Sequence, residues 1–277
     1  MSDKSVALEP NMVLGKSVNP QKQYSPDLLH RISRKDSRQD IFSSMTLPFV
    51  GEDLWHAYEL SWIDKTGKPA VYAAHFTIPS DSPFLIESKS LKLYLNSINT
   101  KLFNDSDSAR KTIATDLSYS CQATVEVTLY QLDDSILSGA TLEGYSVDHC
   151  ILKRGKLEQL KELLDSKEGR SVKECLYSHF LRSVCPVTQQ PDWGSLWIEY
   201  KGRKIDRAGL LTYICSLRNL EGFHEYCIEK IFLDLYSACE PEELSVRGLY
   251  NRRGGLDICP WRSTHLARGP VYRINKQ

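Results

Sequence analysis

The sequence lacks an excess of charge of either sign, since its 277 residues contain 35 Lys and Arg against 35 Asp and Glu. A nucleic-acid-binding protein normally needs a clear basic excess for its phosphate contacts. No apolar run approaches the roughly 20 residues that cross a bilayer, and residues 1–30 contain no apolar stretch of the kind found in a signal peptide. These absences predict a cytoplasmic protein that binds neither nucleic acid nor membrane.

Several motifs with a known chemistry are also missing. The sequence contains no G-x-G-x-x-G and no G-x-x-x-x-G-K-[ST], which excludes the dinucleotide fingerprint and the P-loop. It has no C-x-x-C pair and no H-E-x-x-H, so a finger-type zinc site and a metalloprotease have little support. Its eight cysteines are therefore expected to be reduced and mostly buried, as in other proteins of reducing compartments.

What is present is the composition of a globular protein, with 41% apolar and 25% charged residues. Alternating patterns predict a hairpin from strands at 56–63 and 70–78, and a later strand at 123–132. Helical spacing predicts helices over 88–103 and after Asp105. The second half repeats this order, with strands predicted at 174–188, 195–201 and 243–251 and helices at 207–217 and 223–239.

Short matches between the two halves indicate a duplication. LSYSC at 117–121 resembles LYSAC at 235–239, and TLY at 128–130 resembles GLY at 248–250, at nearly equal offsets. Two β-β-α-α-β units predict an α+β fold whose antiparallel sheets are covered on one face by helices. Residues 1–40 are predicted to form an extended arm, and 157–164 an amphipathic connecting helix.

Two segments of the second half carry reactive side chains. In SVCPVTQQPDWG, a strand runs into a loop at Cys185, where Pro186 turns the backbone away, and Asp192 follows close enough to fold back. In GFHEY, His224 and Glu225 open a helix, whose N-terminus favours acceptor groups nearby. The alternatives are a buried, inert thiol and a solvated polar pair.

Two other segments carry cations. IESKSLKLY at 86–94 places Lys89 and Lys92 near a helix start, where a bound phosphate would offset their charge. NRRGG at 251–255 sets two arginines beside glycines and suits a forked grip on phosphate. Solvated lysines and a surface turn are the alternatives.

Taken together, ESKSLKLY at 87–94, SVCPVTQQPDWG, GFHE and RRGG resemble the NADPH-dependent 7-cyano-7-deazaguanine reductases, the nitrile reductases of queuosine biosynthesis, in their long two-unit form. The resemblance covers the chain from about Pro48 onward. It implies two tandem tunnelling-fold units in one chain, the first at 41–150 and the second at 151–277, after the arm predicted at 1–40. It also implies a homodimer that uses no metal.

The resemblance further implies a role for each matching residue. Cys185 would attack the nitrile carbon to form a covalent thioimide, Asp192 would be the general acid, with its pKa raised by an apolar wall, and His224 would relay protons. Two molecules of NADPH would complete the four-electron reduction of 7-cyano-7-deazaguanine to its aminomethyl product. The implied substrate-binding residues are Ile86, Glu87, Ser88, His224 and Glu225, and the implied cofactor-binding residues are Ser88, Lys89, Arg253 and Gly254.

Three other interpretations stay open at this point. Cys185, His224 and Asp192 could form the triad of a thiol hydrolase or amidotransferase, which would need no reductant. A non-catalytic purine-binding protein on the same scaffold would bind a deazaguanine without a covalent adduct. A zinc-dependent cyclohydrolase relative would contain a stoichiometric metal ion.

Overall fold

A computed structural model of the protein describes residues 23–42, 46–153, 171–265 and 272–277. Its helices are α1 (Arg34–Ser37), α2 (Ser88–Ser97), α3 (Ser106–Cys121), α5 (Arg207–Ser216) and α6 (His224–Cys239). Its strands are β1 (Arg31–Ser33), β2 (Val50–Ile63), β3 (Pro69–Pro79), β4 (Phe84–Ile86), β5 (Glu126–Tyr130), β6 (Tyr145–Ser146), β7 (Val172–Ser178), β8 (Arg182–Val184), β9 (Pro191–Gly202), β10 (Glu243–Tyr250) and β11 (Leu256–Ser263).

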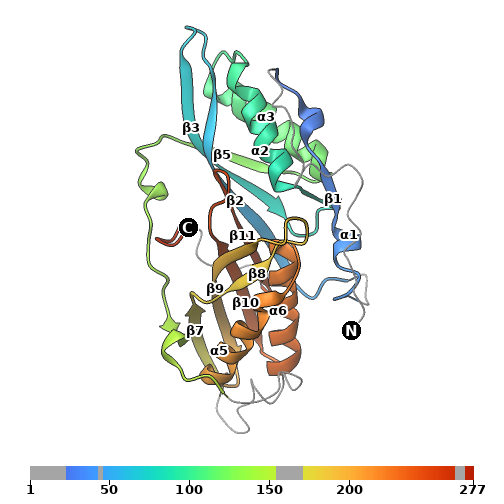
Figure 1. The fold of residues 1–277 in the computed structure, drawn as a ribbon, viewed down its shortest axis with the longest axis vertical. Coiled ribbons are helices and arrows are strands. Elements are labelled where there is room, and N and C mark those ends of the chain that lie inside the picture. Colours follow the sequence, from blue (N-terminus) through green and yellow to red (C-terminus); the bar gives the residue numbers. More distant parts are fainter. Residues whose placement is uncertain (1–22, 43–45, 154–170, 266–271) are drawn as a thin grey trace.

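The fold is α+β and is built on one large sheet (Figure 1). The strand order is β5-β3-β2-β11-β10-β9-β7-β6, and β8 pairs with β9 beside this path. Neighbouring strands are antiparallel except for the parallel pair β6 and β7. Across the ranges described, the helices stay too short or too polar to traverse a lipid bilayer.

The element order predicted for the two halves is present in the structure. The first half runs β2, β3, α2, α3, β5, and the second runs β7, β9, α5, α6, β10. The central contact between the halves is β11, which pairs with β10 on one side and with β2 on the other. The sheet therefore continues from one half into the other without a break.

Alternation along the strands divides the apolar residues between two faces of the sheet. In β9, Leu196 and Ile198 pack into the core under α5 and α6, while Trp197 points to the opposite face and joins a smaller cluster. In β2, Trp55 packs into the core with α2 and α3, while Leu54 joins the same smaller cluster. The helices thus cover one face of the sheet, as predicted.

The helix predicted after Asp105 is confirmed and shows its expected start. The Asp105 side chain accepts a hydrogen bond from the Ser108 backbone N–H, and the Ser108 hydroxyl in turn meets the Asp105 backbone N–H. This reciprocal cap satisfies two donors that the first turn of a helix leaves open. The helix then runs to Cys121 and ends at Gln122, which adopts a left-handed conformation.

Three sequence expectations differ from the structure. The strand predicted at 174–188 is broken after Ser178, and its second part is the separate strand β8. Strand β11 was not predicted at all. The described part of the predicted arm, from residue 23 onward, is not a loose extended segment, because it contains β1 and α1 and buries Arg34. The connecting helix predicted at 157–164 lies outside the described residues.

A network of buried charges joins this N-terminal segment to the sheet and to α6. The Arg262 guanidinium of β11 lies 2.8 Å from Asp53 of β2 and 2.7 Å from Glu229 of α6. Arg34 also pairs with Asp53, and Arg38 lies 2.7 Å from Glu229. Each carboxylate therefore meets at least two guanidinium groups, which lower the pKa of both carboxyls despite burial that would raise it.

We predict that Arg262→Met destabilises the protein strongly. The substitution keeps an unbranched apolar stem but removes the guanidinium, so two buried carboxylates lose their shared partner, which typically costs about 3–5 kcal/mol. Urea unfolding of the variant and the wild type measures the change. The matched control is Arg110→Met, which removes the exposed contact of Arg110 with Asp107 and should change stability little. Equal stability of the two variants would contradict the structural role of the network.

Candidate active site

A cavity of about 220 Å³ lies where α2 and β4 of the first half meet α6, the loop after β8 and the β10–β11 turn of the second. Every predicted site residue except Glu87 lines it. The motifs from the two halves of the sequence thus meet at one cavity, as the resemblance implies. The predicted residues on its wall are Ile86, Ser88, Lys89, Cys185, Asp192, His224, Glu225, Arg253 and Gly254.

Cys185 is the first residue after β8 and is held in a tight loop. Its backbone N–H donates to the Gln190 carbonyl at 2.9 Å, and its carbonyl accepts from Gln189 at 3.0 Å. Because Ser183 pairs with Asp192 in the β8–β9 register, Cys185 and Asp192 share one face of this hairpin. The thiol is buried, but it borders the cavity rather than the hydrocarbon core.

Asp192 lies at the start of β9 and is engaged at both carboxylate oxygens. Oδ2 lies 3.4 Å from His224 Nε2, and Oδ1 accepts from Arg253. Burial alone would raise the pKa of Asp192, but the hydrogen bonds and charges of His224 and Arg253 outweigh it, so the pKa lies below its usual range. The expectation of a raised pKa is therefore wrong for the site as this structure shows it, and Trp193 is 40% exposed rather than part of an apolar wall.

His224 begins α6 and is fixed by an aromatic neighbour. Its ring stacks on Tyr250 of β10, with ring centres 3.8 Å apart and planes inclined by 12°. Nε2 faces Asp192, while the buried Nδ1 makes no hydrogen bond. A preassembled triad would require that second nitrogen to hold the thiol of Cys185. The structure therefore gives no support to the hydrolase interpretation.

Glu225 follows His224 and differs from Asp192 in its charge state. Its side chain is buried on the cavity wall. Burial, together with the negative charge of Asp53, raises the pKa of Glu225 to about 7, although His224 and Arg34 act in the opposite direction. A carboxyl with this pKa can both donate and accept hydrogen bonds near neutral pH.

Glu87 has a different position from the one expected. Its carboxylate accepts hydrogen bonds from the backbone N–H groups of Lys89 and Ser90, both at 2.8 Å, and so caps the N-terminus of α2. The side chain is almost fully buried and is absent from the cavity wall. In this structure Glu87 therefore orients the helix that presents Ser88 and Lys89 to the cavity.

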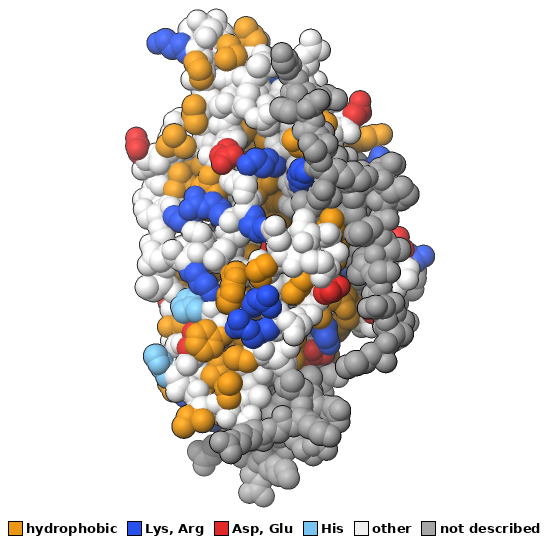
Figure 2. Space-filling model, viewed as in Figure 1, with side chains coloured by type: hydrophobic (Ala, Val, Ile, Leu, Met, Phe, Trp, Pro, Cys, Tyr) orange, Lys and Arg blue, Asp and Glu red, His pale blue; other side chains and the backbone are white. Residues whose placement is uncertain are grey.

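Three cationic side chains lie on the wall of the cavity. Lys89, Lys92 and Arg253 all line it. Figure 2 shows Lys and Arg side chains across the middle of the face where α2 and the β10–β11 turn lie in Figure 1, with few acidic side chains among them. Gly254 has φ +62°, and a Cβ atom there would lie 3.1 Å from the Lys92 side chain. Lys92 and the Gly254 backbone therefore lie side by side on the cavity wall, where the positive charge of Lys92 would favour binding of an anionic group.

The sequence analysis missed several apolar residues of the wall. Ile32 comes from β1 in the predicted arm, and Phe223 immediately precedes His224. Ile32, Leu85, Phe223 and the partly buried Val187 form a small apolar cluster beside the Cys185 loop. Phe223 could have been predicted, because it precedes the predicted site residue His224. Nothing in the sequence connects Ile32 with residues 150 or more positions away.

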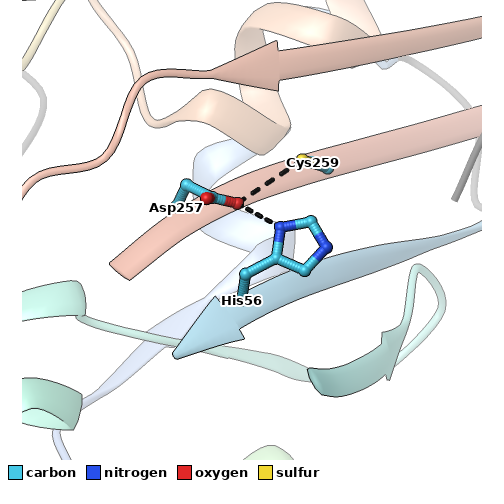
Figure 3. Close-up of side chains that lie close together, drawn as sticks. All are labelled: His56, Asp257 and Cys259. Carbon is cyan, nitrogen blue, oxygen red and sulfur yellow. Dashed lines mark hydrogen bonds and ion pairs between the residues drawn. The ribbon is translucent and has the colours of Figure 1, made fainter. Parts of the chain in front are cut away.

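A second group of titratable side chains lies outside the cavity, on β2 and β11 (Figure 3). His56, Asp257 and Cys259 are the one buried trio in the described ranges whose ligand atoms are close enough for a metal ion. Asp257 already accepts from His56 and, at 2.7 Å, from the Tyr58 hydroxyl. Gln277 donates to Asp257 and Cys259. These contacts explain the trio as a hydrogen-bonded cluster.

Comparison with known proteins gives a consistent result. A family model described as "Nitrile reductase, 7-cyano-7-deazaguanine-reductase N-term" matches residues 20–129, and one described as "QueF-like protein" matches residues 191–268. The NADPH-dependent 7-cyano-7-deazaguanine reductase of Dechloromonas aromatica is 47% identical over 91% of this chain and 89% of its own length. The protein of the same name from Burkholderia lata is 46% identical over 91% of this chain and 93% of its own length.

A solved structure of lower similarity also matches. It is the archaeosine synthase QueF-Like in the apo form, which is 19% identical to this chain, with a TM-score of 0.31, and covers 36% of this chain and 100% of its own.

We predict that Glu225 makes stability depend on pH. The unfolded carboxyl titrates near 4.5 and the folded one near 7. Between these values the folded state binds the extra proton, so the contribution of Glu225 to stability is lost as the pH rises. Glu225→Gln should remove this loss and gain on the order of 2–3 kcal/mol relative to wild type between about pH 4.5 and pH 8. Urea unfolding at the two pH values tests this, with exposed Glu126→Gln as the control. Parallel pH profiles for all three proteins would contradict the raised pKa.

Proposed function

The chain belongs to the family of NADPH-dependent 7-cyano-7-deazaguanine reductases, and we propose that it reduces the nitrile of 7-cyano-7-deazaguanine to an aminomethyl group through a covalent thioimide on Cys185. The product would serve tRNA queuosine biosynthesis. The observation that carries the proposal is the shared cavity, which holds a thiol, two carboxyl groups, an imidazole and several cations drawn from both halves of the chain.

The thiol supplies the nucleophile. The Cys185 sulfur would form a bond to the nitrile carbon while the nitrile nitrogen gains a proton, which gives the thioimide. Covalent catalysis of this kind divides one difficult reduction into easier steps. Asp192 shares a face of the β8–β9 hairpin with Cys185, and His224 contacts Asp192. These two side chains are therefore placed to hold the proton and pass it to the nitrogen.

The carboxyl of Glu225 suits recognition of the deazaguanine ring. It lies on the cavity wall one residue after His224, so ring recognition and proton transfer would come from the same helix start. Ile86 and Ser88 would flank the ring from the first half. Glu87 would contribute by orienting α2 through its cap, and a direct contact with the ring would require the carboxylate to leave that cap.

The cations suit the phosphates of NADPH. Ser88 and Lys89 at the start of α2 and Arg253 and Gly254 in the β10–β11 turn would hold the cofactor, with Lys92 beside them. NADPH supplies hydride when bound, and two molecules account for the four electrons of the reduction. The bare backbone at Gly254 lets the Lys92 side chain approach the turn closely, so that a phosphate held there would meet cations from both the turn and α2.

Further features follow from family membership as part of the same proposal. We propose two tandem tunnelling-fold units, at 41–150 and 151–277, which the repeated element order supports. We also propose a cytoplasmic homodimer that uses no metal. All eight cysteines are free thiols, as expected for a reducing compartment.

We predict that Cys185→Ala abolishes both the covalent adduct and the reduction. Wild-type protein mixed with the nitrile in the absence of NADPH should gain the mass of one substrate molecule, because addition to the nitrile releases nothing. The variant should keep its original mass, and its NADPH oxidation should fall by at least about 10³-fold. Intact-mass spectrometry and absorbance of NADPH measure the two effects.

The matched control is Cys150→Ala, which changes a partly buried thiol that is not on the cavity wall. It should still form the adduct and oxidise NADPH. An unshifted wild-type mass together with tight substrate binding would favour the purine-binding interpretation. Conversion of the nitrile without consumption of NADPH would favour the hydrolase.

A further inference from the structure

The Arg253 side chain lines the cavity and holds a buried acid. One guanidinium nitrogen donates to Asp192 and another to the Gln190 side chain. The two partners differ in exposure, since the Arg253 side chain is 42% exposed and that of Asp192 only 5%. A solvent-accessible cation thus neutralises a carboxylate that is otherwise shielded from water.

The second partner of Asp192 is fixed. His224 is mostly buried, begins α6 and stacks on Tyr250, so it cannot move away without disturbing that helix start. Cys185 shares a face of the β8–β9 hairpin with Asp192. Two further titratable groups near Asp192 are Cys227 of α6 and Tyr250 of β10, and burial raises the pKa of both of these, which leaves them uncharged. Among the described neighbours, Arg253 is therefore the charged partner that a ligand could remove.

Such a movement would involve the Arg253 side chain alone. The backbone of Arg253 is held in the β10–β11 turn by hydrogen bonds with Leu256 in both directions, while the side chain is 42% exposed. Lys89 and Lys92 line the same cavity. An anion bound among these cations would compete directly with Asp192 for the Arg253 guanidinium, because phosphate and carboxylate both accept its forked donors.

We propose that Arg253 is a positioning residue that couples cofactor binding to the acid: a phosphate of the dinucleotide takes Arg253 away from Asp192, and the released carboxylate takes up a proton from solvent. That proton then passes to the nitrile nitrogen as the Cys185 sulfur bonds to the nitrile carbon, and the proton of the Cys185 thiol leaves to solvent, so that the step consumes no net proton. The inference rests on the proposed function, and it explains how a carboxyl that Arg253 and His224 hold ionised becomes an acid.

The direct test is proton uptake on binding of NADP⁺, which cannot reduce the nitrile. Calorimetric titration in two buffers of different ionisation enthalpy, without substrate and near pH 7.5, gives the number of protons taken up. Wild-type protein should take up a substantial fraction of one proton per NADP⁺ bound. Arg253→Gln should bind NADP⁺ more weakly and take up none.

Two further variants separate this effect from a general loss of cofactor affinity. Lys92→Gln removes a cation of the same cavity that does not contact Asp192, so it should weaken binding but keep the proton uptake. Asp192→Asn cannot take up the proton and competes for Arg253 only as a neutral acceptor, so it should bind NADP⁺ several-fold more tightly than wild type without proton uptake. This variant tests the coupling even where Arg253→Gln binds too weakly to measure.

A second measurement is the rate of adduct formation on Cys185. NADP⁺ should accelerate it in wild-type protein, by about tenfold for each unit by which the pKa of Asp192 rises, and should leave the rate in Arg253→Gln unchanged. Equal proton uptake in wild type and Arg253→Gln, or none in wild type, would overturn the coupling while NADPH oxidation with the nitrile still established the reductase. Absence of both the adduct and NADPH oxidation in wild type would instead overturn the proposed function.

Discussion

The Arg262 guanidinium, shared between Asp53 and Glu229, is the contact on which the site depends. With Arg34 and Arg38 it joins the N-terminal segment, β2, β11 and α6, which are far apart in the sequence. Buried charges tolerate few arrangements, because each needs its partners in place. The same network reaches the cavity, since Glu225 lies one helical turn before Glu229 and the charge of Asp53 helps to raise the pKa of Glu225.

Sequence patterns predicted those helices and strands whose formation depends on residues close together in the sequence. The cap at Asp105 and the alternation in β2 and β3 are examples. Strand β11 escaped prediction because it is central and buried along its whole length, so it has no alternation, and because Pro260 is unusual in a central strand. The folded arm escaped for a related reason, since the partners of Arg34 and Ile32 lie in distant elements.

The site shows the same division. Motifs were sufficient to bring Cys185, Asp192, His224 and Glu225 into one cavity. The pKa of Asp192 was predicted to be raised but is lowered. The prediction considered burial without Arg253, which contacts Asp192 from sixty-one residues further along the chain. Glu87 was assigned to substrate because its motif is recognisable, whereas its helix-capping contacts depend on backbone geometry at the start of α2.

The two acids of the cavity have pKa values shifted in opposite directions, which is how one site can hold a proton donor and an acceptor near neutral pH. The pKa of Glu225 is raised by burial and, in addition, by the negative charge of Asp53, whereas the pKa of Asp192 is lowered by its contacts with His224 and Arg253 despite burial. Hydrogen-bond donors on a bound ring would favour the ionised form of Glu225, while loss of Arg253 would favour the protonated form of Asp192. Substrate and cofactor together would therefore reverse both charge states, releasing a proton at Glu225 and binding one at Asp192, where the nitrile requires it.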